Sequence, residues 1–170
     1  AVAELRKAVH HCRYADSIRC VVITASGRMF SAGADINVMI EAKDQIDVMT
    51  RKMAEVLHES LSIILRMEKP VITAVNGFAA GGGLGLSLSG DIVIAAESAK
   101  FTFAYTNSGL TPDGGSTYII PRLIGVRRTV ELAFKNRTLS AQEALEWNMV
   151  TQVVPDDQLM DTAMGLAKKL

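Results

Sequence analysis

The sequence has no excess of charge of either sign, few cysteines and no long uninterrupted apolar run. Eighteen basic and eighteen acidic residues give a formal net charge of zero over 170 residues. A protein that binds nucleic acid or an anionic membrane usually carries a basic surplus, so charge argues against both partners. The two cysteines, Cys12 and Cys20, lack the spacing of metal ligands. We therefore expect free thiols in a reducing compartment and no metal site.

The apolar stretches are short and are interrupted by serine, glycine or charged residues, so no transmembrane helix is predicted. The opening segment, residues 1–16, carries charge throughout and does not resemble a secretory signal. Hydrophobic residues make up 49% of the chain, which is enough for one substantial core. These features predict a single domain over residues 1–170 of a cytoplasmic protein.

Candidate strands and helices alternate along the chain. Short β-branched runs predict strands over residues 20–25, 71–75, 91–97 and 149–154. Helical periodicity predicts helices over residues 1–13 and 51–67, and a capping box of Ser140 and Glu143 predicts a third helix through Trp147. Strands separated by helices favour an α/β fold with much parallel pairing.

The segment "GFAAGGGLGLSLSGD" (residues 77–91) places six glycines in fifteen positions, and its periodicity fits a strand or a helix. It lacks the spacing of a dinucleotide fingerprint, a P-loop or a serine-hydrolase elbow. Two interpretations remain open. The glycines let two backbones pack closely, or they expose backbone N–H groups that hold an oxyanion. A second amide for such a site would come from "GRMFSAGADI" (residues 27–36).

Four segments in the same order resemble the crotonase, or enoyl-CoA hydratase/isomerase, superfamily. They are "FSAGADI" (30–36), "KPVITAVNGFAAGGGLGLSLSGDIVIAAESAKF" (69–101), "GLTPDGGSTYIIPRLIG" (109–125) and "LSAQEALEWNMVTQVVP" (139–155). The resemblance implies a core of repeated ββα units in a spiral and an acyl-CoA thioester substrate. It implies no cofactor, because coenzyme A enters as part of the substrate, and a homotrimer or a dimer of trimers. Family chains usually extend further at both ends, so we expect that N- and C-terminal extensions are missing here.

The resemblance also assigns roles to residues of the two loops. The backbone amides of Ala34 and Gly82 are expected to stabilise the enolate of the thioester. The neighbouring positions expected to contact the substrate are Ala32, Asp35, Ile36, Gly81, Tyr105 and Gly114.

Two acids of the hydratases are absent from the matching positions, which hold Gly85 and Tyr105. A carboxylate is present at Asp113 in "TPDGG", where related isomerases, including an aromatic epoxide isomerase subgroup, place their acting aspartate. Taken alone, Pro-Asp-Gly is a turn sequence. Within the resemblance, Asp113 is predicted to be a proton shuttle. We therefore expect an isomerase that moves a double bond from 3-enoyl-CoA to 2-enoyl-CoA, with Asp113 buried beside the acyl chain.

Other interpretations stay open at this point. The protein could be an enoyl-CoA hydratase, an isomerase of aromatic epoxyacyl-CoA or a silent acyl-CoA-binding scaffold. Some relatives bind RNA, but zero net charge argues against that partner. Asp35 and Asp91 are expected to be structural caps, and Tyr105 to line the acyl pocket or donate a hydrogen bond. The three histidines, His10, His11 and His58, are predicted to lie on helices without a partner.

Overall fold

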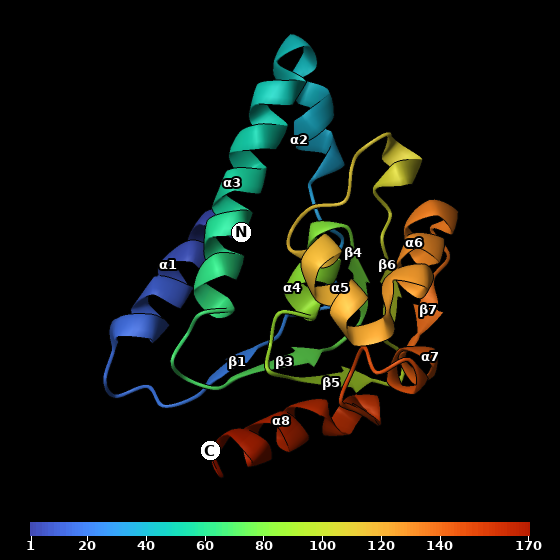
Figure 1. Cartoon of the computed structure of the whole chain (residues 1–170). Helices are drawn as coiled ribbons and strands as arrows, with labels where there is room; N and C mark the ends of the chain where they lie inside the picture. Colours follow the sequence, from blue (N-terminus) through green and yellow to red (C-terminus); the bar gives the residue numbers. More distant parts are fainter.

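Two four-stranded sheets form the centre of the protein in the computed structural model, which describes residues 1–170 apart from the side chain of Ile36. The first sheet is parallel throughout and has the order β1 (Val21–Ile23), β3 (Val71–Val75), β5 (Ile92–Ala96), β8 (Gln152–Val154). The second has the order β2 (Met29–Ser31), β4 (Phe78–Ala80), β6 (Lys100–Thr102), β7 (Leu139–Ser140), and only β7 is antiparallel. The strands of the two sheets run in different directions (Figure 1). The predicted α/β class with parallel pairing is confirmed.

Each of the first three strand pairs is followed by helical structure, as a repeated ββα spiral requires. The helices after β2 are α2 (Ile36–Glu41), η1 (Lys43–Gln45) and α3 (Ile46–Ile64), and α4 (Gly82–Ser87) follows β4. After β6 come η2 (Thr106–Ser108), α5 (Ser116–Ile124) and α6 (Val126–Lys135). The remaining helices are α1 (Val2–Tyr14), α7 (Ala141–Glu146), η3 (Asp156–Gln158) and α8 (Leu159–Ala167). Successive units place their first strands side by side in one sheet and their second strands side by side in the other.

Three apolar clusters hold these layers together. The largest joins α4 and α5 to both sheets and includes the fully buried Leu84, Phe101 and Ile120. A second lies where α8 covers the first sheet, below it in Figure 1. The third packs α1 against α3 and the edge strand β1. Helix α3 extends beyond the sheets, with α2 beside its far end (Figure 1).

The structure resolves the ambiguity of the glycine segment in favour of a helix, because Leu84 and Leu86, whose alternation also fits a strand, lie in α4. Residues Phe78–Ala80 form β4, Gly81 turns the chain, and Gly82–Ser87 form α4. The predicted helix over 51–67 begins earlier, at Ile46, and ends at Ile64. Strands β2, β4 and β6 and helices α2, α5, α6 and α8 were not predicted as elements. The prediction of a single domain stays a prediction.

In the part of the chain that the structure describes, no helix combines the length and apolarity needed to cross a bilayer. Both cysteines are free and half-buried. Burial is the main cause that raises the pKa of the Cys20 thiol. Cys20 therefore favours the uncharged thiol that a packing role requires.

The predicted capping box at the start of α7 is present and makes a testable contribution to acid stability. Glu143 accepts from the Ser140 amide (2.9 Å) and from Arg137 (2.8 Å). These two contacts, the Ser140 bond first, lower the pKa of Glu143 from 4.5 to about 2. Because the unfolded chain takes up this proton first, the contribution is present above pH 4.5 and is lost as the pH falls toward 2.

We expect wild-type protein to lose about 1 kcal/mol more unfolding free energy than Glu143→Gln over that pH range, since glutamine can cap without titrating. Urea unfolding at neutral and acidic pH measures the difference, and all other carboxylates titrate equally in both proteins. Parallel pH curves for the two proteins would contradict the assignment.

Candidate active site

Two loops meet at the carboxyl ends of the neighbouring parallel strands β2 and β4. The chain after β2 runs through residues 32–35, and the chain after β4 turns at Gly81. A Cβ atom built on Gly33 would lie 3.0 Å from the Ala80 oxygen and 3.3 Å from the Gly82 nitrogen. Only a glycine lets the two loops approach this closely, so the backbone that carries Ala34 lies against the turn that carries Gly82.

The backbone amides in these loops are available to a ligand. Gly82 is the first residue of α4, so its N–H has no partner within the helix. Among the described residues, no protein group accepts a hydrogen bond from the Ala34 or Gly82 amide. Gly81 turns the chain with a φ of +55° and donates to the Phe103 carbonyl at 3.1 Å. Gly81 therefore makes a strand-to-helix turn before the Gly82 amide, and convergence of that amide with that of Ala34 on one oxygen stays a prediction.

The loop that carries Asp113 packs directly on this turn. A Cβ atom built on Gly114 would lie 3.6 Å from the Gly82 α-carbon and 3.7 Å from Leu57 of α3. A Cβ atom built on Gly82 would come within 2.8 Å of the same Leu57 methyl group. Gly82, Gly114 and Leu57 thus form one contact, to which three distant parts of the chain contribute.

Asp113 combines a turn with a side chain that has two partners. Its carbonyl accepts from the Ser116 amide at 3.0 Å, which closes the turn before α5. One carboxyl oxygen, Oδ1, accepts from the Tyr105 hydroxyl at 2.8 Å, and Oδ2 lies 3.0 Å from His58 Nε2. The side chain is 36% exposed, so the expected burial is incomplete. Asp113 therefore closes the expected turn, and its role as a proton shuttle stays a prediction.

Tyr105 is buried and acts as a fixed donor to Asp113. Burial is the main cause that raises the pKa of its phenol, and the adjacent Asp113 carboxylate raises it further. The raised pKa favours the protonated hydroxyl, which donates to Asp113. Of the two roles left open for Tyr105, the hydrogen-bond donor is the one that the structure shows.

The prediction that His58 lacks a partner is wrong. Besides Asp113 Oδ2, its Nε2 lies 3.3 Å from the Gly114 amide. His10 likewise contacts Glu59 at 3.1 Å on the surface. The pairing of His58 joins residues 55 positions apart on α3 and the α5 loop, and no local sequence pattern signals it.

The remaining predicted residues occupy less central places. Ala32, Ala34 and Asp35 are exposed, and the Asp35 carboxylate accepts from the Asn37 amide at 2.9 Å, which confirms the expected cap of α2. Ile36 begins that helix, and its side chain lies outside the described residues. Asp91 accepts from the Val71 amide at 2.9 Å and so ties the starts of β3 and β5 together.

Both the sequence and the fold of the chain match those of known proteins. The sequence profile described as Enoyl-CoA hydratase/isomerase matches residues 1–170. The chain belongs to this family. It is 41% identical over 169 residues to the 1,2-epoxyphenylacetyl-CoA isomerase of Escherichia coli, covering 99% of this chain and 64% of the relative. It is 32% identical over 157 residues to a trans-2-decenoyl acyl-carrier-protein isomerase of Streptococcus mutans, covering 92% of this chain and 60% of the relative.

A crystal structure of an enoyl-CoA hydratase from Bacillus anthracis superimposes with a TM-score of 0.92 at 36% identity, covering 99% of this chain and 64% of that one. The chain thus spans about three fifths of the length of these relatives. Because hydratases and isomerases are both among them, family membership leaves the reaction to be argued from the site residues.

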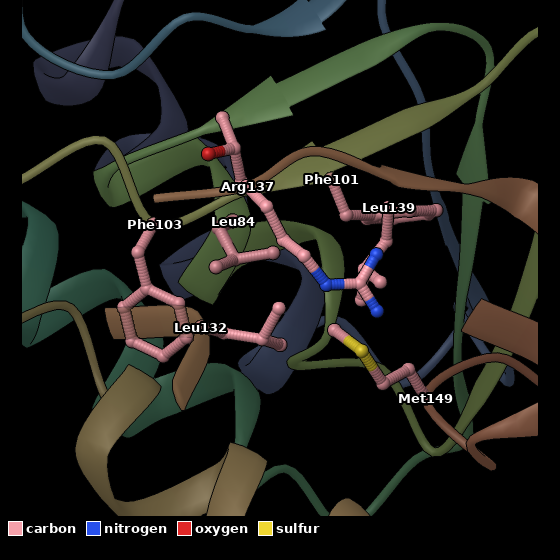
Figure 2. A pocket seen from close by; sticks show the side chains of 8 residues that line it. Leu84, Phe101, Phe103, Leu132, Arg137, Leu139 and Met149 are labelled. Carbon is pink, nitrogen blue, oxygen red and sulfur yellow. The ribbon is translucent and has the colours of Figure 1, made fainter. Parts of the chain in front are cut away.

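In this member of the enoyl-CoA hydratase/isomerase family, two hollows lie away from the predicted site residues. Figure 2 shows a crevice between α4, β6 and α6 that is lined by Leu84, Phe101, Phe103, Leu132, Arg137, Leu139 and Met149. It has no room for a water molecule. A larger, open hollow of about 340 Å³ lies beside Asp91 and Asn148. Neither hollow is lined by Asp113, Ala34 or Gly82. The candidate site is the loop junction beside Leu57, where Gly82 and Gly114 meet.

Proposed function

We propose that the protein is an acyl-CoA isomerase that moves a carbon–carbon double bond in a thioester, with Asp113 as the proton carrier. The observation that carries the proposal is the contact between the Asp113 loop and the turn at Gly82. Through Gly114, the residue after Asp113, it packs the loop of a hydrogen-bonded carboxylate on the turn whose Gly82 amide has no acceptor among the described residues. A base next to an oxyanion site is what removal of a proton α to a thioester carbonyl requires.

The proposed reaction needs one carboxylate and no net proton exchange. Asp113 removes a proton from C2 of a 3-enoyl thioester, and the electron pair moves into a dienolate. The Ala34 and Gly82 amides stabilise the charge that develops on the thioester oxygen, each donor being worth about 100- to 1000-fold in rate. Asp113 then returns the proton to C4, the double bond forms between C2 and C3, and Asp113 is a carboxylate again.

The same steps explain why we propose no additional cofactor. No electrons enter or leave, and the proton that is removed is given back, so coenzyme A takes part only as the thioester of the substrate. Positions 85 and 105 hold glycine and tyrosine, which leaves no second carboxylate there to activate water. A homotrimer or dimer of trimers stays a prediction.

The identity to 1,2-epoxyphenylacetyl-CoA isomerase supports a second candidate, rearrangement of an aromatic epoxyacyl-CoA. Such a reaction can use the same amide pair, because charge again develops at the thioester oxygen. Assay of an aromatic epoxide beside a linear 3-enoyl-CoA distinguishes the two substrate classes.

The deciding experiment supplies the full-length protein with 3-enoyl-CoA and, separately, with 2-enoyl-CoA. We expect the first to be converted to the conjugated 2-enoyl-CoA, and deuterium placed at C2 to reach C4. Little 3-hydroxyacyl-CoA should form from the second. Rapid hydration of 2-enoyl-CoA would contradict the proposal, and calorimetric binding of acyl-CoA without turnover of any substrate would show a scaffold.

A further inference from the structure

His58 contacts the proton carrier without having a place in the reaction proposed above. It lies on α3, next to Leu57, and its side chain is 47% exposed. Its Nε2 has two neighbours, Asp113 Oδ2 at 3.0 Å and the Gly114 amide at 3.3 Å. One ring nitrogen of a neutral imidazole either donates or accepts, so it can serve only one of the two at a time.

We propose that His58 is a positioning residue that donates from Nε2 to Asp113 and fixes the orientation of the carboxylate. The inference rests on the proposed isomerase function. A hydrogen bond to a charged carboxylate is stronger than one from an amide to a neutral ring, and here it is also the shorter contact. The Nε2–H tautomer is therefore favoured while Asp113 is ionised.

Two donors on different oxygens determine how the carboxylate is oriented. Tyr105 donates to Oδ1 and His58 to Oδ2, so rotation of the carboxyl group would break both bonds. Each oxygen keeps a free lone pair for the substrate proton. The half-exposed Asp113 cannot depend on tight packing for its orientation, which makes the second donor necessary. Proton removal at one carbon and return two carbons away requires that the base be held in one place.

The test uses a pair of amide substitutions that differ in reach. Glutamine places its amide nitrogen near the position of Nε2, whereas asparagine is too short to reach Asp113. We expect His58→Asn to lower kcat for 3-enoyl-CoA isomerisation by about 10- to 100-fold, the value of a hydrogen bond to a charged group. His58→Gln should recover most of that loss, and KM should change little in either variant because the bond acts on the base.

Thermal unfolding of both variants serves as the control for structure, and similar midpoints are expected because His58 is half exposed. Wild-type kcat in His58→Asn would overturn the proposal. An equal loss in both variants would also overturn it, since the donor at the Nε2 position would then be irrelevant.

A second measurement does not depend on activity. Imidazole ¹⁵N NMR should show the Nε2–H tautomer of His58 in the wild type. In Asp113→Ala, only the Gly114 amide remains as a partner, and the ring should change toward the Nδ1–H tautomer. An Nδ1–H ring in the wild type would overturn the pairing. If the wild-type protein isomerised no substrate, the proposed function would fail, while the tautomer would still decide whether His58 donates to Asp113.

Discussion

Asp113→Asn is expected to lower kcat for double-bond migration by about 10²- to 10⁴-fold, the usual contribution of a positioned acid–base group. Asparagine has the size of aspartate, and its carbonyl can still accept the Tyr105 hydrogen bond that Asp113 Oδ1 accepts. It cannot take up a proton from C2, so the cycle stops before the dienolate forms. Product formation from 3-enoyl-CoA under saturating conditions measures the loss.

Binding separates this explanation from a loss of structure. The Ala34 and Gly82 amides are unchanged in the variant, so calorimetry with a saturated acyl-CoA should give an affinity within about threefold of wild type. Asp156→Asn is the matched control: its Oδ1 accepts from the Ser98 amide at 3.0 Å, and it has no contact with the loop junction. Normal turnover by Asp113→Asn would contradict the proton-carrier role. Equal loss of turnover in Asp156→Asn would show that the effect is not specific to Asp113.

Local sequence patterns predicted the parts of the fold that depend on short-range physics. The β-branched run at 71–75 became β3, whose residues are buried throughout, and Ser140 and Glu143 formed their capping box. Strands β2, β4 and β6 contain no run of β-branched residues, unlike the equally short β1 and β8, so no local signal marks them. They are defined by the pairing of one with the next, a long-range contact that no single segment encodes.

The site was predicted unevenly for the same reason. The glycines and small residues of the two loops marked the junction, because close approach of backbones leaves a compositional signal. The resemblance to the family placed Asp113 beside it. His58 was missed because its role depends on where α3 crosses the α5 loop, and a histidine on an amphipathic helix looks the same with or without a partner.

The structure also explains why position 85 holds glycine and not an acid. A Cβ atom on Gly85 would overlap the carbonyl oxygen of Gly114, so α4 and the Asp113 loop approach each other through a position that must be glycine. The resemblance to the family implies a glutamate at the matching position of the hydratases. In this chain, the close packing of Gly114 on α4 therefore excludes a side chain at position 85. The absence of an acid at position 85 and the proposed use of Asp113 are therefore linked by the contact between Gly85 and Gly114.

Gly85→Ala is accordingly expected to destabilise the protein by about 1–3 kcal/mol and to lower isomerisation more than stability alone would explain. The added methyl group must displace the Gly114 backbone, which has no flexible side chain to yield, and Asp113 would move with it. Gly85→Glu should be worse and should gain no hydratase activity, because the new carboxylate cannot enter the space that Gly114 fills. Urea unfolding and the two enoyl-CoA assays measure these effects.

Gly165→Ala in α8 provides the comparison, since it changes a helical glycine whose added Cβ atom would have no neighbour within 4 Å. That variant should be more stable by up to about 1 kcal/mol, as alanine favours a helix over glycine. If the two substitutions change the unfolding free energy in opposite directions, packing against Gly114, and not helix propensity, is the reason for glycine at position 85. If Gly85→Ala were also stabilising and fully active, the loop could not be packed on α4 as described. The link between the missing acid and the position of Asp113 would then be lost.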